Sequence, residues 1–328
     1  MTNPALSYLE KHLADNPFNS LTDPLMLSYV LCKPLMLFAF PIGLIFWKHL
    51  ATWQKLSIAA IVSVDILSYI AIGTNKGIFD YVLVLPFLIF LKAYRTKRSI
   101  RKKLPSAPGV MPKGNYILAL VALIFIVLSF SYFTSGNMDR KKHYLLYEPS
   151  TGVFIDPNSG VMEYIPSFLK FSYLSLDNYV TQGYYALELS LEMEFIWTYG
   201  LGHSFFTTTV GEKVLGDSSI SYRTYQHRLE QEFGYSHYGK WHTFFVWFAN
   251  DLSFPGVVLL VFFLSRMLGS VWHKSIHNFD ILSVTLLMQL IIMFFYLPAN
   301  NQVLGFMGSQ VSFILLLSLW MLNGRVKF

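Results

Sequence analysis

The chain carries several uninterrupted apolar stretches, each close to the length needed to cross the hydrocarbon core of a membrane. A helical crossing of about 30 Å takes about 20 apolar residues. Seven stretches approach or meet this length, at residues 25–47, 56–72, 78–94, 115–134, 244–268, 281–297 and 303–322. Because lipid offers no partner for an unpaired backbone amide, each stretch is expected to be helical. The sequence therefore predicts an all-α polytopic integral membrane protein with about seven transmembrane helices.

The composition agrees with this class. Only 13% of the 328 residues are charged, whereas a soluble domain carries about a quarter. An ordinary soluble enzyme and a disordered chain are both excluded. The single cysteine, Cys32, excludes an intramolecular disulfide and any metal site built from several cysteines.

The basic residues predict the orientation. The link after the third stretch, residues 95–103, holds six Lys or Arg residues, and short loops of this kind stay in the cytoplasm. Alternation from this link divides the chain into four parts. Residues 1–24 form an outer N-terminal segment, 25–134 the first four transmembrane helices, 135–243 a large outer loop, and 244–328 the last three helices with a short cytoplasmic tail.

The outer loop differs in character from the rest of the chain. Residues 135–243 hold 8 Lys or Arg against 12 Asp or Glu, and 12 of the 20 tyrosines. Tyrosine combines a flat apolar face with a hydroxyl, which suits a sugar ring as well as a membrane interface. Within the loop we expect a short strand or interfacial stretch at 168–176, an amphipathic helix at 184–199 and a polar helix at 222–233.

Cations on the outer face form one group of candidate site residues. Lys76 lies in a tight turn between two stretches, Arg140 follows the fourth stretch, and Arg223 and Arg228 lie within the outer loop. A guanidinium can bind phosphate oxygens through two parallel hydrogen bonds, so these residues are candidates for binding a diphosphate. The alternatives are snorkelling to lipid headgroups for Lys76 and Arg140, and surface ion pairs with neighbouring glutamates for the two loop arginines.

Polar residues near or within the apolar stretches form a second group. His242 lies at the outer end of the fifth stretch, with Asn250 and Asp251 about two turns deeper. An ionisable residue within a span is costly and is a functional candidate by default. His242 has the pKa range of a general base, or it hydrogen-bonds a headgroup. Asp65, midway in the second stretch, is either functional or paired with a structural partner such as Lys33.

Several kinds of active site lack their sequence signature. The chain has no HExxH zinc motif, no glycine-rich phosphate loop and no GxSxG elbow. We therefore expect no metal site, and neither nucleotide hydrolysis nor serine-esterase chemistry.

Three segments stand out, namely GTNKGIFD at 73–80, GYYALELSLEMEFIWTYGLGHS at 183–204 and HTFFVWFANDLSFPG at 242–256. They resemble segments of the O-antigen or oligosaccharide repeat-unit polymerases of Gram-negative bacteria, which are related to the O-antigen ligases. The resemblance implies a glycosyltransferase-C-like fold in the bacterial inner membrane, with a large periplasmic loop that covers the active site. This chain has fewer spans than the ten or more that are common in the family.

The resemblance also implies an activity. Such enzymes transfer the growing glycan from undecaprenyl diphosphate to the non-reducing end of another lipid-linked repeat unit, without a metal or cofactor. The bases would be His242 and His203, with Asp251 as a further catalytic residue. The diphosphate and substrate would be held by Lys76, Arg140, Arg223, Arg228 and Asn250. The expected partners are the lipid-linked oligosaccharide, membrane lipid and a chain-length regulator, with no nucleic acid.

Two alternatives stay open. The first is an O-antigen ligase or another polyprenyl-linked glycosyltransferase, although the latter usually carries an acidic pair in its first outer loop, which residues 73–77 lack. The second is a transporter or a non-catalytic component of glycan export. A transporter usually shows internal repeats or paired broken helices, and the predicted spans show no such symmetry.

Overall fold

The computed structural model describes residues 24–71, 76–103, 147–148, 153–154, 156, 160–237 and 239–323. Within these residues the regular secondary structure is helical except for one pair of two-residue strands. The chain forms two compact units. Of the described residues, the first unit contains those within Ser131–Val261 and Met293–Phe306. The second contains those within Asp23–Phe130, Phe262–Ile292 and Met307–Phe328. Each unit therefore combines segments that are far apart in the sequence.

The described chain is rich in long apolar helices, as predicted. Four helices of the described chain are long and apolar enough to cross a membrane, namely Leu27–His49, Thr52–Ile70, Gly77–Thr96 and Phe244–His277. Two shorter apolar helices are Ile281–Tyr296 and Met307–Asn323. These helices coincide with six of the seven predicted stretches, and the predicted stretch 115–134 lies outside the described residues. The chain is thus compatible with a membrane protein.

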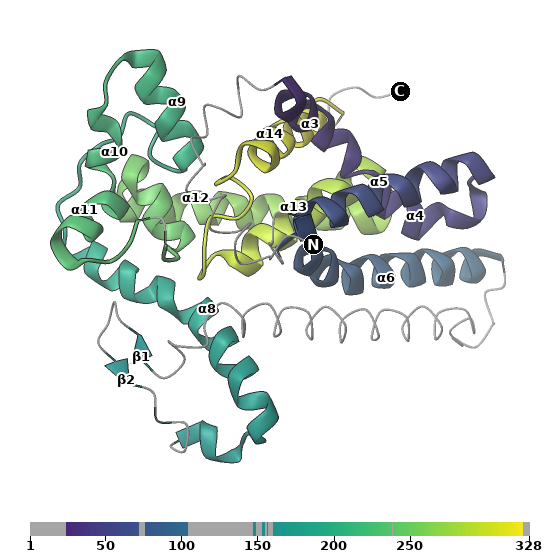
Figure 1. Ribbon diagram of the computed structural model, residues 1–328. Helices are drawn as coiled ribbons and strands as arrows, with labels where there is room; N and C mark the ends of the chain where they lie inside the picture. The colour runs from purple at the N-terminus through teal and green to yellow at the C-terminus, as the bar shows by residue number, and fades with distance from the viewer. Residues whose placement is uncertain are drawn as a thin grey trace. The chain divides into compact units, whose positions relative to one another are not determined.

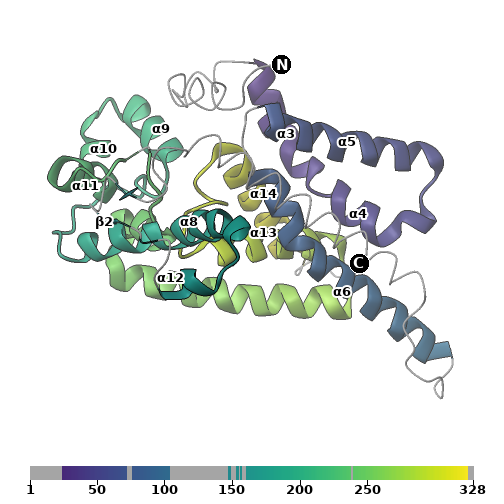
Figure 2. The same cartoon turned by 60° about the horizontal axis from the view of Figure 1, so that its bottom comes forward.

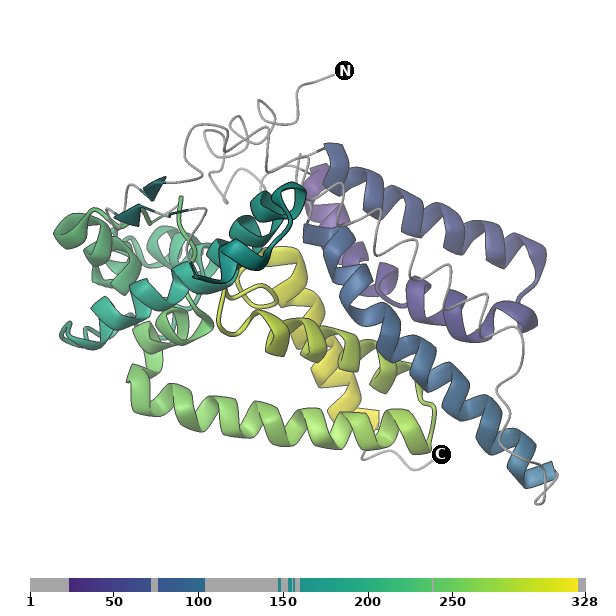
Figure 3. The same cartoon turned by 90° about the horizontal axis from the view of Figure 1, so that it is seen from below.

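The second unit is built from apolar helices. It contains α3 (Pro24–Met36), α4 (Ala39–Phe46), the short η1 (Trp47–His49), α5 (Thr52–Ala71), α6 (Lys76–Lys103) and α14 (Met307–Asn323). The helices α4, α5 and α6 pack against one another and run side by side (Figure 3), and α14 packs on α3. Most of α13 (Ile281–Tyr296) also belongs to this unit.

One buried polar cluster joins α3, α5 and α6 within this unit. Lys33 and Asp65 form an ion pair, and both residues are less than a tenth exposed. Tyr29 Oη lies 3.0 Å from Lys33 Nζ, and Tyr81 Oη donates to Asp65 Oδ2 at 2.8 Å. Tyr69 Oη lies 3.4 Å from the same ammonium. The predicted pairing of Asp65 with Lys33 is confirmed, and the surrounding hydroxyls satisfy both charges.

The first unit contains the shorter helices and the strand pair. Strands β1 (Tyr147–Glu148) and β2 (Val153–Phe154) pair antiparallel, with Tyr147 opposite Phe154. After them come η2 (Gly160–Tyr164), α8 (Ser167–Leu191), α9 (Phe205–Leu215), α10 (Ser219–Arg223) and α11 (Tyr225–Phe233). Figures 1 and 2 show α9, α10 and α11 grouped at one end of α8, and α11 packs on α8 through Leu229 and Ala186.

Local signals in the sequence explain where these helices begin and end. Ser204 caps α9 by accepting a hydrogen bond from Thr207 N at 3.1 Å, and Thr224 caps α11 by accepting from His227 N at 3.3 Å. Both helices end at a glycine with positive φ, Gly216 and Gly234. The predicted helix at 222–233 is confirmed, with a break at Thr224.

Two predictions for this unit are wrong. Residues 168–176 are not a strand, because they form the first part of α8. A short aromatic-rich run fits either a strand or a helix, and its period does not decide between them. The predicted helix at 184–199 ends at Leu191. Beyond it the backbone of Tyr199 (φ 59°) and Gly200 (φ 80°) is left-handed, which no α-helix accommodates.

The helix α12 (Phe244–His277) bends sharply near its start. Ser253 has φ 59° and ψ 166°, which are not helical angles, so α12 is physically two helices that meet at this residue. Pro255 follows closely, and a proline inside a helix lacks an amide proton and collides with the preceding turn. The first piece, 244–252, belongs to the first unit. Asn250 and Asp251 both lie on this first piece.

Candidate functional site

The main feature of the first unit is a histidine held by a carboxylate. His203 Nδ1 lies 3.0 Å from Asp251 Oδ2. With Nδ1 protonated by this contact, the neutral ring carries its lone pair on Nε2, so that Nε2 can accept a proton. The His203 side chain is 19% exposed and that of Asp251 is 7% exposed. The imidazole is thus accessible, while the group that orients it is buried.

Other contacts fix both members of this pair. Asp251 Oδ1 accepts a hydrogen bond from Gly202 N at 2.9 Å and lies in contact with the Thr198 hydroxyl. The His203 ring stacks on Phe248, with centroids 5.3 Å apart and ring planes 21° apart. Asn301 Nδ2 donates to the His203 carbonyl at 2.7 Å. The ring and the backbone of His203 therefore both have fixed partners, as a preorganised base requires.

Backbone contacts tie the segment before His203 to the start of α12. The Asn250 carbonyl accepts from Thr198 N at 3.3 Å and from Thr198 Oγ1 at 2.8 Å. Gly202 has no room for a side chain, because a Cβ there would lie 2.2 Å from Thr198 Oγ1 and 2.6 Å from Asn250 Cβ. The close approach of residues 198–203 to Asn250 and Asp251 thus depends on this glycine.

Asn250 has a supporting role in this arrangement. The residue is fully buried, and its side-chain oxygen accepts from Tyr225 N at 2.7 Å. Its side-chain nitrogen donates to Gly202 O at 2.8 Å, to Gln226 Oε1 at 2.9 Å and to Trp247 O at 3.1 Å. No part of the amide is left for a substrate in this geometry. Asn250 therefore positions the segments around the His203–Asp251 pair and does not contact a ligand.

His242 lies in the interior of the first unit. It is 1% exposed, with its ring 5.2 Å from that of Tyr235. Nε2 lies 3.4 Å from the Ser236 carbonyl, and Nδ1 has no hydrogen-bond partner among the described residues. Burial lowers the pKa of His242 to about 4. A substrate hydroxyl does not reach this ring in the present geometry, and its low pKa makes it a weak base.

The two loop arginines have different surroundings. Arg228 Nη1 donates to the Glu194 carbonyl at 2.9 Å, and its guanidinium lies 4.7 Å from the Tyr225 ring centre. Arg223 lies 4.8 Å from the ring centre of Tyr199, and its Nε is 3.4 Å from Ser219 Oγ. Neither arginine has an ion-pair partner within 4 Å among the described residues, so the predicted alternative of pairs with neighbouring glutamates is not observed.

The structure does not describe the side chains of two predicted cations, Lys76 and Arg140. Lys76 is the first residue of α6, and nothing is described of its side chain beyond that position. Arg140 lies outside the described residues.

Within the described parts of the chain, no three His, Cys, Asp or Glu residues come close enough together to hold a metal ion.

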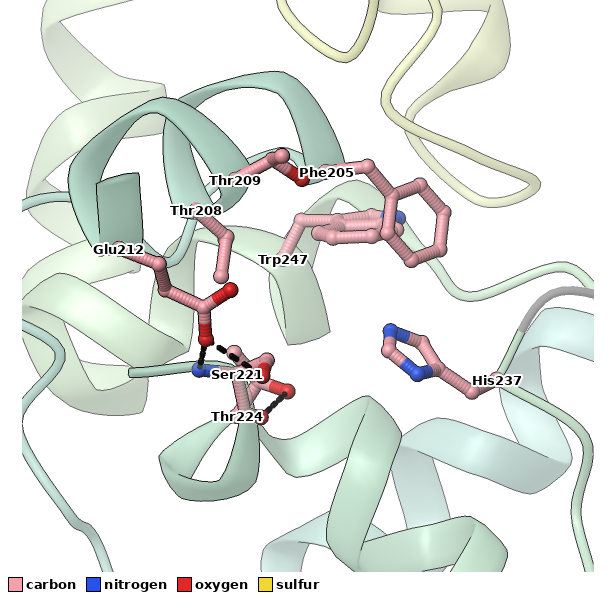
Figure 4. A pocket seen from close by; sticks show the side chains of 8 residues that line it. All are labelled: Phe205, Thr208, Thr209, Glu212, Ser221, Thr224, His237 and Trp247. Carbon is pink, nitrogen blue, oxygen red and sulfur yellow. Dashed lines mark hydrogen bonds between the residues drawn. The ribbon is translucent and has the colours of Figure 1, made fainter. Parts of the chain in front are cut away.

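A small cavity of about 60 Å³ lies between α9, α10 and the start of α12 (Figure 4). Glu212 Oε1 accepts from Ser221 N at 2.9 Å and from Ser221 Oγ at 2.6 Å on one wall. Burial, together with the nearby His242 and His227, lowers the pKa of His237 on the opposite wall to about 3. An engineered cavity of about 150 Å³ holds a benzene molecule. The cavity is therefore too small for a sugar ring and is the size of a site for a few water molecules. Its walls are Phe205, Thr208, Thr209, Glu212, Ser221, Thr224, His237 and Trp247.

Sequence reasoning missed the residues that hold the pair. Thr198, Gly202, Phe248 and Asn301 each contact His203, Asp251 or both. The sequence Gly-Leu-Gly-His at 200–203 offers a signal, since two glycines within the three residues before a histidine indicate a tight backbone approach. Nothing in the sequence indicated Asn301, which is 98 residues from its partner.

Comparison with known proteins gave no match. No protein-family model matches the chain, and neither the curated proteins nor the solved structures include one that is significantly similar to it.

Proposed function

We propose that this protein is an oligosaccharide repeat-unit polymerase of the bacterial inner membrane. It would transfer a growing glycan from undecaprenyl diphosphate to the non-reducing end of a second lipid-linked repeat unit, at the periplasmic face. The observation that carries this proposal is the His203–Asp251 pair, an accessible imidazole held by a buried carboxylate. We further propose that the chain has about seven spans and a periplasmic segment at 135–243. The resemblance of three sequence segments to this family also supports the proposal.

The reaction requires a base for the acceptor hydroxyl. His203 Nε2 would take the proton from this hydroxyl while its oxygen attacks the anomeric carbon of the donor glycan. The bond from that carbon to the diphosphate oxygen breaks, and undecaprenyl diphosphate leaves. The negative charge of Asp251 favours the imidazolium that forms on His203, as in other carboxylate–histidine pairs. The proton and the leaving group are both accounted for, and the step needs no oxidant or cofactor.

The leaving diphosphate requires cations. Arg223 fits this need among the described residues, because its terminal nitrogens have no hydrogen-bond partner there. Lys76 and Arg140 remain candidates from the sequence. Arg228 is the weaker candidate, since one of its terminal nitrogens is already bonded to the Glu194 carbonyl.

Gel analysis of lipopolysaccharide tests the proposal. In a strain that lacks the protein, wild-type protein should restore a ladder of many chain lengths. His203→Ala and Asp251→Asn proteins, present at matched levels, should leave only core with a single repeat unit. The double variant should be no worse than either single variant, because residues that act as a unit are not additive. His227→Gln is the matched control, since His227 makes one side-chain hydrogen bond, to Gln231, and lies outside the pair.

Two other results would contradict the proposal. A full ladder from the His203→Ala protein would remove His203 from the chemistry. Loss of all O-antigen, including the single repeat unit, would locate the defect in ligation, in transport or in assembly of the unit. The alternatives of an O-antigen ligase or an export component would then replace the polymerase.

A further inference from the structure

Two exposed aromatic side chains project from the segment that precedes His203. Trp197 is 53% exposed and Tyr199 is 43% exposed. Their ring centres are 5.2 Å apart, and the ring planes meet at 62°. The two rings therefore form a corner with an indole on one side and a phenol on the other. Because both rings are partly exposed and adjacent, their apolar faces are open to a ligand.

The backbone holds this corner rigidly. Thr198, between the two aromatics, is fully buried and bonded to the Asn250 carbonyl. Tyr199 has φ 59°, a conformation that side-chain-bearing residues rarely adopt. Such strain persists only where the surroundings enforce it, and it is concentrated at functional sites. The position of both rings is thus set before any ligand arrives, which lowers the entropic cost of binding.

A cation completes the corner. The Arg223 guanidinium lies 4.8 Å from the Tyr199 ring centre, and Ser219 Oγ lies 3.4 Å from its Nε. Its terminal nitrogens are free to bind among the described residues. Asp217 is the nearby acid, and its pKa is lowered mainly by hydrogen bonds from Ser219 and less by the charge of Arg223. The ion pairs found among the described residues do not include Asp217 with Arg223. Arg223 is therefore oriented by Ser219 without a direct ion pair.

We propose that Trp197, Tyr199 and Arg223 form a subsite for a sugar ring that carries an anionic group. The apolar face of a pyranose stacks on an aromatic ring, and a guanidinium binds a carboxylate or phosphate through two parallel hydrogen bonds. The anion is either the carboxylate of a uronic acid or the phosphate of a sugar phosphate, since Arg223 recognises both in the same way. With a phosphate, Arg223 binds the donor's own diphosphate, as proposed above. With a uronate, Arg223 binds the sugar, and the leaving diphosphate depends on Lys76 and Arg140. This assignment rests on the proposed function for its biological setting, and its binding test is independent of turnover.

A membrane interface also attracts tryptophan and tyrosine. Three observations favour the sugar instead. The rings stand at a fixed angle, Tyr199 is held in a strained backbone, and the same segment continues to His203 four residues later. Anchoring in a headgroup layer requires none of these, because that layer is fluid. A donor or acceptor sugar bound at the corner would contact the same short segment that carries the proposed base, His203.

Binding of three matched sugars tests the subsite. Full-length protein in lipid nanodiscs is titrated with a methyl glycoside, the corresponding methyl uronide and the corresponding sugar 1-phosphate, each in gluco and galacto form. Saturation-transfer NMR reports the affinities. At least one anionic sugar should bind about tenfold more tightly than the neutral glycoside, as expected for charge-assisted hydrogen bonds. The uronide and phosphate arms identify which anion the site prefers.

Variants separate the two contributions. Arg223→Gln should remove the tenfold preference and leave the neutral glycoside unaffected, whereas Trp197→Ala should weaken binding of all three sugars. Tyr164→Ala is the matched control, because Tyr164 is 84% exposed in the same unit and lies outside the corner. Equal affinity for the neutral and anionic sugars, or an effect of Tyr164→Ala as large as that of Trp197→Ala, overturns the subsite.

Two further measurements keep this inference apart from its alternatives. Brominated lipids quench an interfacial tryptophan. The chain has seven tryptophans, so the test is the part of the quenched fluorescence that is lost in Trp197→Phe. A clear loss would assign the corner to the membrane and overturn the subsite. Anionic-sugar preference together with an unchanged ladder in the His203→Ala strain would retain the subsite and reject the polymerase. A lost ladder without any sugar preference would do the reverse.

Discussion

The ion pair of Lys33 and Asp65 allows a sharp test of what holds the second unit together. Both partners are buried, at 7% and 4% exposure, between helices that are apolar on their other faces. Replacing Lys33 by Met removes the cation and leaves the Asp65 carboxylate with only the hydroxyls of Tyr29 and Tyr81. Breaking a buried pair in this way costs about 3–5 kcal/mol, because one charge stays buried without compensation.

The double variant distinguishes this cause from simple loss of contacts. Lys33→Met with Asp65→Leu removes both charges together and should recover most of the lost free energy of unfolding, since an apolar replacement of a buried pair is often neutral or stabilising. The matched control is Lys55→Met, because Lys55 lies 5.9 Å from the Trp47 ring centre at the edge of the same unit. A cation–π contact of this kind contributes about 0.5–1 kcal/mol.

Unfolding in mixed micelles of increasing dodecyl sulfate content measures these differences. The expected order of stability is wild type and double variant highest, Lys55→Met slightly lower, and Lys33→Met lowest by several kcal/mol. If the free energy of unfolding of Lys33→Met lay within about 1 kcal/mol of wild type, the pair would behave like an exposed ion pair. That result, or a double variant no more stable than Lys33→Met, would refute the reasoning.

The remaining predictions concern the first unit. Because the folded-state pKa values of His237 and His242, about 3 and about 4, lie below the ordinary value of 6.5, the unfolded chain binds more protons between pH 6.5 and 4. The contribution of these two histidines to the free energy of unfolding should be complete above pH 6.5. As the pH drops below 6.5, each histidine should lower this free energy by up to about 1.4 kcal/mol per pH unit. His242→Gln should flatten this fall in melting temperature, and an equally steep fall in the variant would contradict the assignment. Gly202→Ala should destabilise by about 1–3 kcal/mol and impair chain extension, since its Cβ would overlap Thr198 Oγ1 and Asn250 Cβ. Ladder gels and melting curves of this variant together would check it, and a wild-type result in both would show that the close approach is absent.

The long apolar helices could be predicted from the sequence because they depend on local properties. A run such as 78–94 must be helical in lipid wherever the rest of the chain lies. The pairing of Lys33 with Asp65 was also accessible, because two opposite charges in neighbouring apolar stretches have few other ways to be compensated. By contrast, the length of α8 could not be predicted, since the aromatic run at 168–176 suits a strand and a helix equally well.

The candidate site shows where such reasoning ends. Asp251 stood out individually as an ionisable residue in an apolar run, and His203 through a family resemblance, but their contact spans 48 residues and is tertiary. His242 was assigned to the surface because it precedes an apolar helix. Its burial results from packing against Tyr235 and Trp247, whose positions depend on the fold of the whole unit.

The break in α12 connects these features. Pro255 makes a continuous helix unfavourable, and the irregular residue is Ser253. Carbonyls near the end of a helix need partners outside it, and the Asn250 carbonyl, three residues before the break, accepts from Thr198. This contact holds the exposed Trp197 at one end of the segment and, through Gly202, His203 at the other. A local defect in a membrane-length helix thus positions both the proposed base and the proposed sugar subsite.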